Sequence, residues 1–130
     1  MRQIKYILIH EALPENSPGV PRIRRDLNLG YHYIVSTDGV VRNPIEVRFP
    51  GAFMPSQLRS FDNFNACAIG ILLNGSLADE SLRPALINLI VELRSHFPEA
   101  KILDVSEIDG KDVKVRDDMN QLRLLLSNEL

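Results

Sequence analysis

The chain lacks several features that are typical of disulfide-linked, membrane-spanning and nucleic-acid-binding proteins. It contains one cysteine, Cys67, among 130 residues, so an internal disulfide is excluded. No apolar stretch approaches the roughly 18 residues that a membrane-spanning helix needs. Its 15 basic and 17 acidic side chains leave a net charge of −2, which creates no field that would attract nucleic acid or an anionic membrane. We therefore expect neither nucleic acid nor a membrane as a partner.

The amino-terminal residues also lack the pattern of a secretory signal. A short apolar run follows Met1, is interrupted by Lys5 and ends at His10, with no small-residue cleavage site. As it stands the chain is predicted to be cytoplasmic, and an export signal lost by trimming stays open as an alternative. There is no Gly-x-Ser-x-Gly motif and no glycine-rich phosphate loop. Cys67 lies in an apolar run, which is typical of a buried free thiol rather than a nucleophile.

What the chain does contain is the composition of an ordinary globular domain. Hydrophobic residues make up 45% and charged residues 25%, and the length suits a single domain, 1–130, with one core. Branched apolar runs and the hairpin signal Asp38-Gly39 predict strands. The predicted strands are Ile4–Ile9, Tyr31–Val35, Val40–Arg42, Ala66–Leu73 and Lys101–Val105.

Two amphipathic helices accompany these strands. Asp79 can cap the first helix, which ends before Pro98, and Asp117 or Asp118 can cap the last one. The last helix is expected to turn Met119, Leu122, Leu125 and Leu126 inward. The interleaved elements predict an α/β fold with a mixed central β-sheet of about five strands flanked by helices. Between them, residues 43–65 are predicted to form a long irregular segment of the kind that often binds ligands.

Three motifs carry a resemblance to a known family. His10 ends the first predicted strand, Gly30-Tyr31-His32-Tyr33 precedes the Asp38-Gly39 hairpin, and the first long helix ends in Phe97-Pro98-Glu99-Ala100-Lys101-Ile102. Together they resemble the zinc-dependent N-acetylmuramoyl-L-alanine amidases, whose fold is shared by phage lysozyme-type amidases and peptidoglycan recognition proteins. The resemblance implies that His10 matches the first zinc ligand and that Tyr31 matches the catalytic tyrosine. Lys111 falls where some relatives carry a lysine near the zinc site.

The chain departs from the family at the other two zinc ligands. The histidine of the family's Gly-His-Arg-Asp motif is replaced by Val105, and Val113 stands where a cysteine or aspartate completes the site. A catalytic zinc needs about three protein ligands and an open position for water, and valine has no lone pair to offer. On this alignment two of the three zinc ligands are missing.

Other interpretations of these residues stay open. Carboxylates bind zinc, so Asp104, Glu107, Asp109 and Asp112 could rebuild a site with His10, although ordinary loop acids would look the same. His10 without partner ligands is typical of a hydrogen-bonded structural histidine. Tyr31 alone is an amphipathic side chain that lines a groove. A solvated lysine is the simpler interpretation of Lys111, and structural roles are expected for His32 and for His96 at its helix end.

We therefore hypothesise a catalytically degenerate amidase-like protein. It would bind a peptidoglycan fragment or a protein partner, without a cofactor, in a groove lined by His10, Tyr31, Asn65 and Asp104. An alternative is an active amidase that hydrolyses the bond between N-acetylmuramic acid and L-alanine at a non-standard zinc site. A third possibility is a structural or oligomeric module whose groove has closed.

Overall fold

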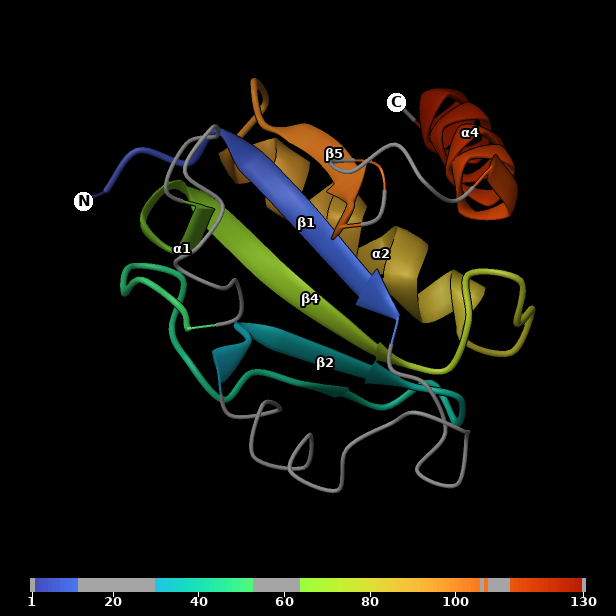
Figure 1. Ribbon diagram of the computed structural model, residues 1–130, viewed down its shortest axis with the longest axis horizontal. Coiled ribbons are helices and arrows are strands. Elements are labelled where there is room, and N and C mark those ends of the chain that lie inside the picture. Colours follow the sequence, from blue (N-terminus) through green and yellow to red (C-terminus); the bar gives the residue numbers. More distant parts are fainter. Residues whose placement is uncertain (1, 12–29, 53–63, 106, 108–112, 130) are drawn as a thin grey trace.

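Continuous apolar runs place strands β1 (Tyr6–Glu11) and β4 (Ala68–Asn74) side by side in the middle of a sheet (Figure 1). Three successive residues of β1 and six of β4 are buried, so both faces of the sheet must be covered. The structure is a computed structural model that describes residues 2–11, 30–52, 64–105, 107 and 113–129.

The sheet has five strands in the order β3-β2-β4-β1-β5. The pairs β1–β4, β1–β5 and β2–β4 are parallel, whereas β2 and β3 form an antiparallel hairpin. The hairpin turns at Gly39, which has a φ of 84°, and the backbone N–H of Val40 donates to Asp38 Oδ1 over 3.0 Å. The predicted mixed five-stranded α/β fold is thus confirmed. The remaining strands are β2 (Tyr33–Ser36), β3 (Val41–Arg42) and β5 (Lys101–Asp104).

Helix α2 (Arg83–His96) follows β4 and carries Pro84 in its first turn, as the sequence predicts. Its N-cap residue is Leu82, which makes no side-chain cap. The expectation that Asp79 caps this helix is wrong, because its Oδ2 accepts the backbone N–H of Ser76 over 2.9 Å within the preceding turn.

Helix α4 (Val113–Glu129) begins several residues before the predicted caps at Asp117 and Asp118. Met119, Leu122 and Leu126 are buried, but Leu125 is 38% exposed, so its predicted inward position is wrong. The three buried residues follow the spacing of one helix stripe, and Leu125 lies about 100° around the helix from Leu126.

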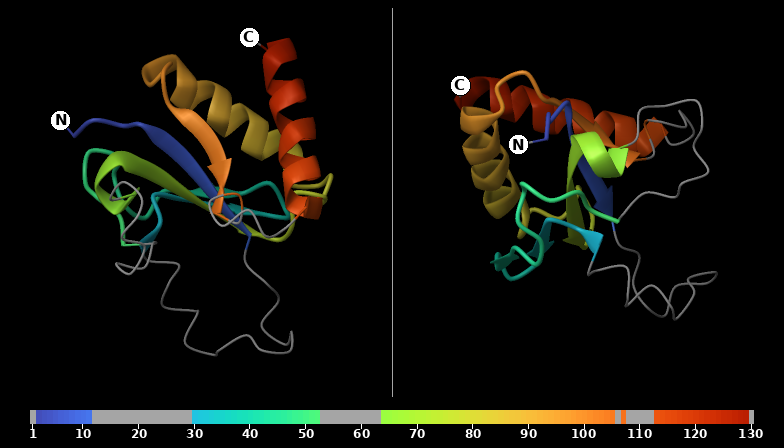
Figure 2. Two further views of the ribbon diagram at one scale, coloured as in Figure 1. Left: turned by 45° about the horizontal axis from the view of Figure 1, so that its top comes forward. Right: turned by 90° about the vertical axis from the view of Figure 1, so that its left-hand side faces the viewer.

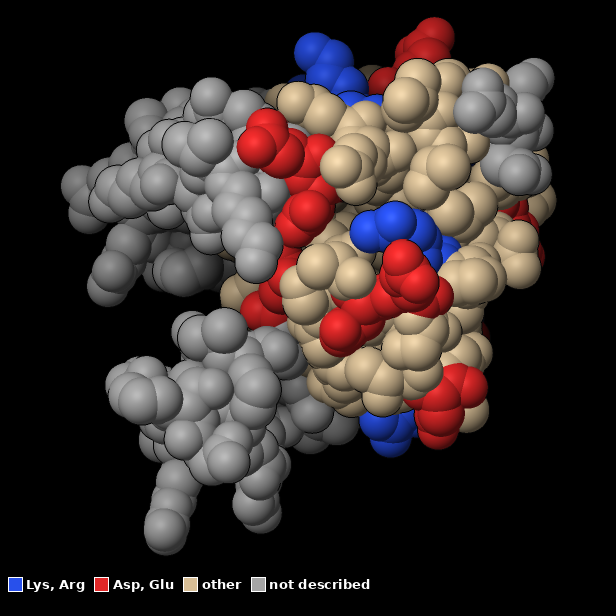
Figure 3. Space-filling view, turned by 90° about the vertical axis from the view of Figure 1, so that its right-hand side faces the viewer, with Lys and Arg blue, Asp and Glu red and all other residues tan. Residues whose placement is uncertain are grey.

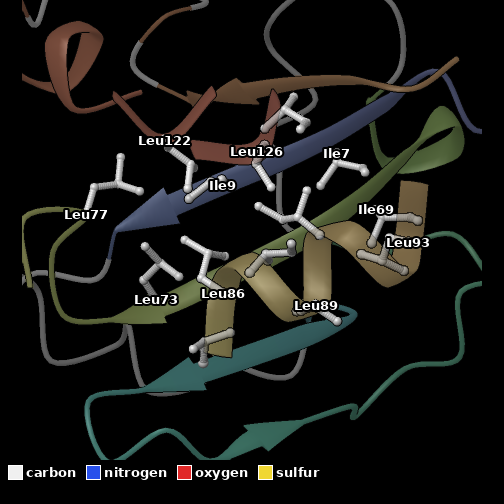
Figure 4. Packing of buried hydrophobic residues seen from close by; sticks show 14 of the residues in the cluster. Ile7, Ile9, Ile69, Leu73, Leu77, Leu86, Leu89, Leu93, Leu122 and Leu126 are labelled. Atoms are coloured by element: carbon white, nitrogen blue, oxygen red, sulfur yellow. The ribbon is translucent and has the colours of Figure 1, made fainter. Parts of the chain in front are cut away.

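Two apolar clusters cover the two faces of the sheet. The larger one fills the space between the sheet and helices α2 and α4, which lie on the same side of it (Figure 2). In this cluster Leu86 and Leu122 point from the two helices toward Ile9 of β1 (Figure 4). The second cluster covers the opposite face and consists of Leu8, Tyr31, Ile34, Phe64, Ala68 and Leu72.

The segment between β3 and β4 is partly as predicted. Residues 43–52 are irregular, residues 53–63 lie outside the described part, and α1 (Phe64–Cys67) ends the segment. Cys67 is half-buried in α1, so its predicted place within the buried strand is wrong. Among the described residues, no helix is both long and apolar enough to cross a membrane.

Gly30 is required by a close approach of two backbone segments. Its carbonyl accepts the N–H of Ala52 over 2.9 Å, and a Cβ at position 30 would lie 2.3 Å from the Ala52 carbonyl oxygen. This contact fixes the entry into β2 and therefore the position of the neighbouring Tyr31.

We expect Gly30→Ala to lower the free energy of unfolding by about 1–3 kcal/mol, because the backbone of Ala52 must move to admit the methyl group. Urea unfolding measures the change. Val40→Ala is the control, since that side chain is 49% exposed and its loss should change stability by less than about 0.5 kcal/mol. Equal stabilities of Gly30→Ala and the parent chain would contradict the prediction.

Candidate functional site

The candidate site lies where the parallel strands end. Strands β1, β2, β4 and β5 run in the same direction, so their carboxyl ends meet at one edge of the sheet. Ligands of α/β proteins bind outside that edge. His10 lies next to the end of β1 and is paired with Leu72 of β4.

The structure brings His10 and Tyr31 together, as the family resemblance implies. Side chains alternate along a strand, so His10 points to the same face as Leu8, and this is the face that carries Tyr31 in the second cluster. The Tyr31 hydroxyl and His10 Nδ1 form a hydrogen bond. The two rings are tilted by 44° with centroids 5.9 Å apart, and Tyr31 is only 2% exposed.

Val105 lies on the same face of the sheet. It directly follows β5, is partly buried and packs against the cluster that contains Leu8 and Tyr31. The position that resembles a zinc-ligand position therefore contributes an apolar contact beside the His10–Tyr31 pair. Val113 is the first residue of α4, but its side chain lies outside the described residues, as does Lys111.

Asp104 and Asn65 do not join this pair. Asp104 is paired with Ile9 of β1, so the alternation places it on the face of α2 and α4, opposite His10. Asn65 lies in α1 before the start of β4, whereas Leu72, the partner of His10, is near the end of that strand. Four strand residues span roughly 13 Å. The prediction that Asp104 and Asn65 line a groove together with His10 and Tyr31 is therefore wrong.

Glu107 is held by an ion pair that sequence reasoning missed. Its Oε1 accepts Arg123 Nη2 over 2.7 Å and the backbone N–H of Asp104 over 2.9 Å, and its Oε2 accepts Arg123 Nη1 over 3.0 Å. Arg123 also donates to the carbonyl of Ile102 over 2.8 Å. These bonds join α4 to β5. Sixteen residues separate the two charges, so no short-range pattern in the sequence predicts the pair.

The described residues do not fit the zinc centre that the fold implies. They contain no group of three or more His, Cys, Asp or Glu side chains placed to hold a metal ion. His10 is already bonded to Tyr31 through Nδ1, and Glu107 is paired with Arg123. Asp104 points to the other face of the sheet. Two of the acids proposed for a rebuilt site, Asp109 and Asp112, lie outside the described residues.

His32 has the structural role that the sequence predicts. It is fully buried, and its Nδ1 accepts the backbone N–H of Gly70 over 3.0 Å. The proton must then sit on Nε2, which donates to the carbonyl of Phe49 over 2.7 Å. Burial lowers the pKa of His32, the bond to Phe49 opposes this, and the nearby Arg2 guanidinium lowers the pKa further.

Arg2 is a second contact that sequence reasoning missed. Its guanidinium donates to the carbonyls of Val47 over 3.0 Å and Ala66 over 2.9 Å, and lies 3.0 Å from His32 Nε2. It thereby joins the amino-terminal end to two segments that are far away in sequence. Nothing in the local pattern around Arg2 could have indicated this role.

Among the described residues, the surface at this edge of the sheet is more acidic than basic. On the side where β1 and β4 end, acidic side chains cover more area than basic ones (Figure 3). Glu11, at the end of β1, accepts the backbone N–H of Leu77 over 3.1 Å and so stabilises the turn after β4. Such a surface does not favour a polyanionic ligand.

Comparison with solved structures identifies the fold as that of N-acetylmuramoyl-L-alanine amidases, in agreement with the resemblance in the sequence. N-acetylmuramoyl-L-alanine amidase LysC from Clostridium intestinale URNW is 18% identical, with a TM-score of 0.62 over 82% of this chain and 72% of that one. Endolysine N-acetylmuramoyl-L-alanine amidase LysCS from the same organism is 19% identical, with a TM-score of 0.61 over 82% and 71%.

A third similar structure is the Ph2119 endolysin from Thermus scotoductus MAT2119 bacteriophage Ph2119. It is 24% identical, with a TM-score of 0.53 over 81% of this chain and 73% of that one. No protein-family model matches the chain, and no curated protein sequence does. At these identities the likeness concerns the fold, and function must be argued from the site.

The buried neutral His32 makes stability depend on pH. Its pKa is lower in the folded chain than the ordinary value of 6.5, so below that pH the unfolded chain binds a proton that folded His32 does not. We expect full stability above about pH 6.5 and a loss of up to about 1.4 kcal/mol per pH unit below it. Urea unfolding at a series of pH values measures the slope.

The comparison variant is His32→Gln, which should be less stable but should have a flatter pH profile. Val40→Ala is the control, because Val40 carries no titratable group and is 49% exposed, so its profile should keep the slope of the parent chain. A His32→Gln profile as steep as that of the parent chain would refute the assignment.

Proposed function

We propose that this chain is a catalytically inactive amidase-like protein that binds a peptidoglycan fragment, a muropeptide or a stem peptide. The fragment would bind at the carboxyl end of β1, beside the partly exposed His10 and Val105. One observation carries the proposal: His10 and Tyr31 are held together at this edge, while Val105 lies beside them without a metal-binding atom.

The absence of catalysis follows from what amide hydrolysis by this family would require. A zinc ion activates the attacking water and polarises the amide carbonyl, and it needs about three protein ligands. Of the positions that resemble ligands, His10 alone has a lone pair to offer, and its Nδ1 is engaged with Tyr31. The proposal therefore includes no bound cofactor.

The choice of ligand rests on the fold and on the surface. Two similar structures are named as amidases of N-acetylmuramoyl-L-alanine, so a fragment containing this linkage is the ligand class that the shared fold favours. Acidic side chains outweigh basic ones among the described residues at this edge, which disfavours nucleic acid (Figure 3). A protein partner in the same place is the alternative that a binding experiment must exclude. A cytoplasmic location stays a prediction.

The first experiment measures zinc per chain by elemental analysis after equilibration with zinc and dialysis. We expect far less than stoichiometric zinc, both in the parent chain and in His10→Ala, because a single imidazole does not hold zinc against solvent. Near-stoichiometric zinc that disappears in His10→Ala would contradict the proposal. It would instead favour an active amidase with a non-standard zinc site.

The second experiment titrates the chain with a purified muropeptide in a calorimeter. Val105→Lys should weaken binding by about tenfold or more, roughly 1.4 kcal/mol, because it places a charge on the apolar part of the site. Leu124→Lys is the matched control, since Leu124 is 66% exposed on α4 and should not affect binding. Melting temperatures measured for both variants would check that each is folded.

Three outcomes would contradict the assignment. Release of L-alanine-linked peptide from the muropeptide would show catalysis. No binding of either muropeptide or stem peptide would remove the proposed ligand class and favour a protein partner or a closed structural module. Equal binding by the parent chain and Val105→Lys would move the site away from the carboxyl ends of β1 and β5.

A further inference from the structure

The contacts of His10, which matches the family's first zinc ligand, suggest a role other than metal binding. Tyr31 is 2% exposed, so its hydroxyl needs a hydrogen-bond partner inside the protein. His10 Nδ1 is such a partner. The bond therefore gives this buried hydroxyl a partner inside the protein.

This bond also removes His10 Nδ1 from metal binding. In one tautomer Nδ1 accepts the proton of the hydroxyl, and in the other it donates its own proton to the hydroxyl oxygen. In both cases Nδ1 has no lone pair left for a metal ion. A zinc ion bound through this nitrogen would have to break the bond to Tyr31.

The pair joins strands that are not neighbours in the sheet. Tyr31 leads into β2, His10 belongs to β1, and β4 lies between them. Both side chains are on the face of the second cluster, so the bond must pass over β4. Gly70 is the residue of β4 paired with Leu8 on this face.

The surroundings of the pair strengthen it. Leu8 and Leu72 are buried beside it in the second cluster, and Val105 packs against that cluster from the end of β5. A hydrogen bond in apolar surroundings is stronger than one in water. A valine at position 105 is thus suited to a hydrogen-bonded pair and unsuited to a metal centre.

We infer that His10 and Tyr31 form a metal-free structural pair that fastens β1 to the start of β2 across β4. This role does not depend on the proposed ligand, and it would hold equally if the chain bound a protein. His10 is thus a positioning residue for Tyr31.

A double-mutant cycle on the ligand-free chain tests the inference. Urea unfolding is measured for His10→Ala, Tyr31→Phe and the double variant. Each single variant should destabilise the chain, and the double variant should be more stable than additivity predicts. The coupling should change the unfolding equilibrium constant at least about fivefold, about 1 kcal/mol. Should His10→Ala not fold, His10→Leu takes its place in the cycle.

Tyr33→Phe combined with His10→Ala is the matched control. Tyr33 loses the same hydroxyl two residues away but packs against the other cluster, so its effect should add to that of His10→Ala within about twofold. A second readout is the melting temperature with added zinc chloride, which should not rise. Additive effects of His10 and Tyr31, or a zinc-dependent rise that is lost in His10→Ala, would overturn the inference.

Discussion

The parallel pairing of β1 with β4 is the constraint on which the rest of the structure depends. Its register sets Leu8 against Gly70 and His10 against Leu72, and both strands are buried on both faces. A shift by one residue would turn His10 toward α2 and α4 and would bring Ile9 to the face of Tyr31. The apolar runs of both strands forbid such a shift, because it would also exchange the two clusters. The position of the candidate site is therefore a consequence of core packing.

Much of this arrangement could be predicted from the sequence, and the errors have physical causes. Apolar runs and the Asp38-Gly39 turn predict the five strands, and the family resemblance implies that His10 and Tyr31 line one groove. The face of Asp104 was not predictable, because it depends on the register between β1 and β5. Leu125 was misplaced because a helix with adjacent leucines offers two possible stripes.

The contacts that the sequence could not indicate are those between charged side chains and distant backbone groups. Arg2 reaches carbonyls more than forty residues away, and Arg123 reaches both Glu107 and Ile102. Composition and periodicity report which residues are buried together, but they carry no information on such partners. The two apolar clusters hold the sheet between them, so the basis of the fold is hydrophobic packing.

The pairing of Glu107 with Arg123 has a consequence for how the chain behaves at high concentration. Strand β5 is an edge of the sheet, and edge strands with unpaired backbone groups invite pairing with other molecules. Here the Ile102 carbonyl is taken by Arg123 and the Asp104 N–H by Glu107. At the other edge, β3 is only two residues long. Both edge strands of the sheet are thus poor templates for pairing with other molecules, and the Glu107–Arg123 ion pair protects the longer one, β5.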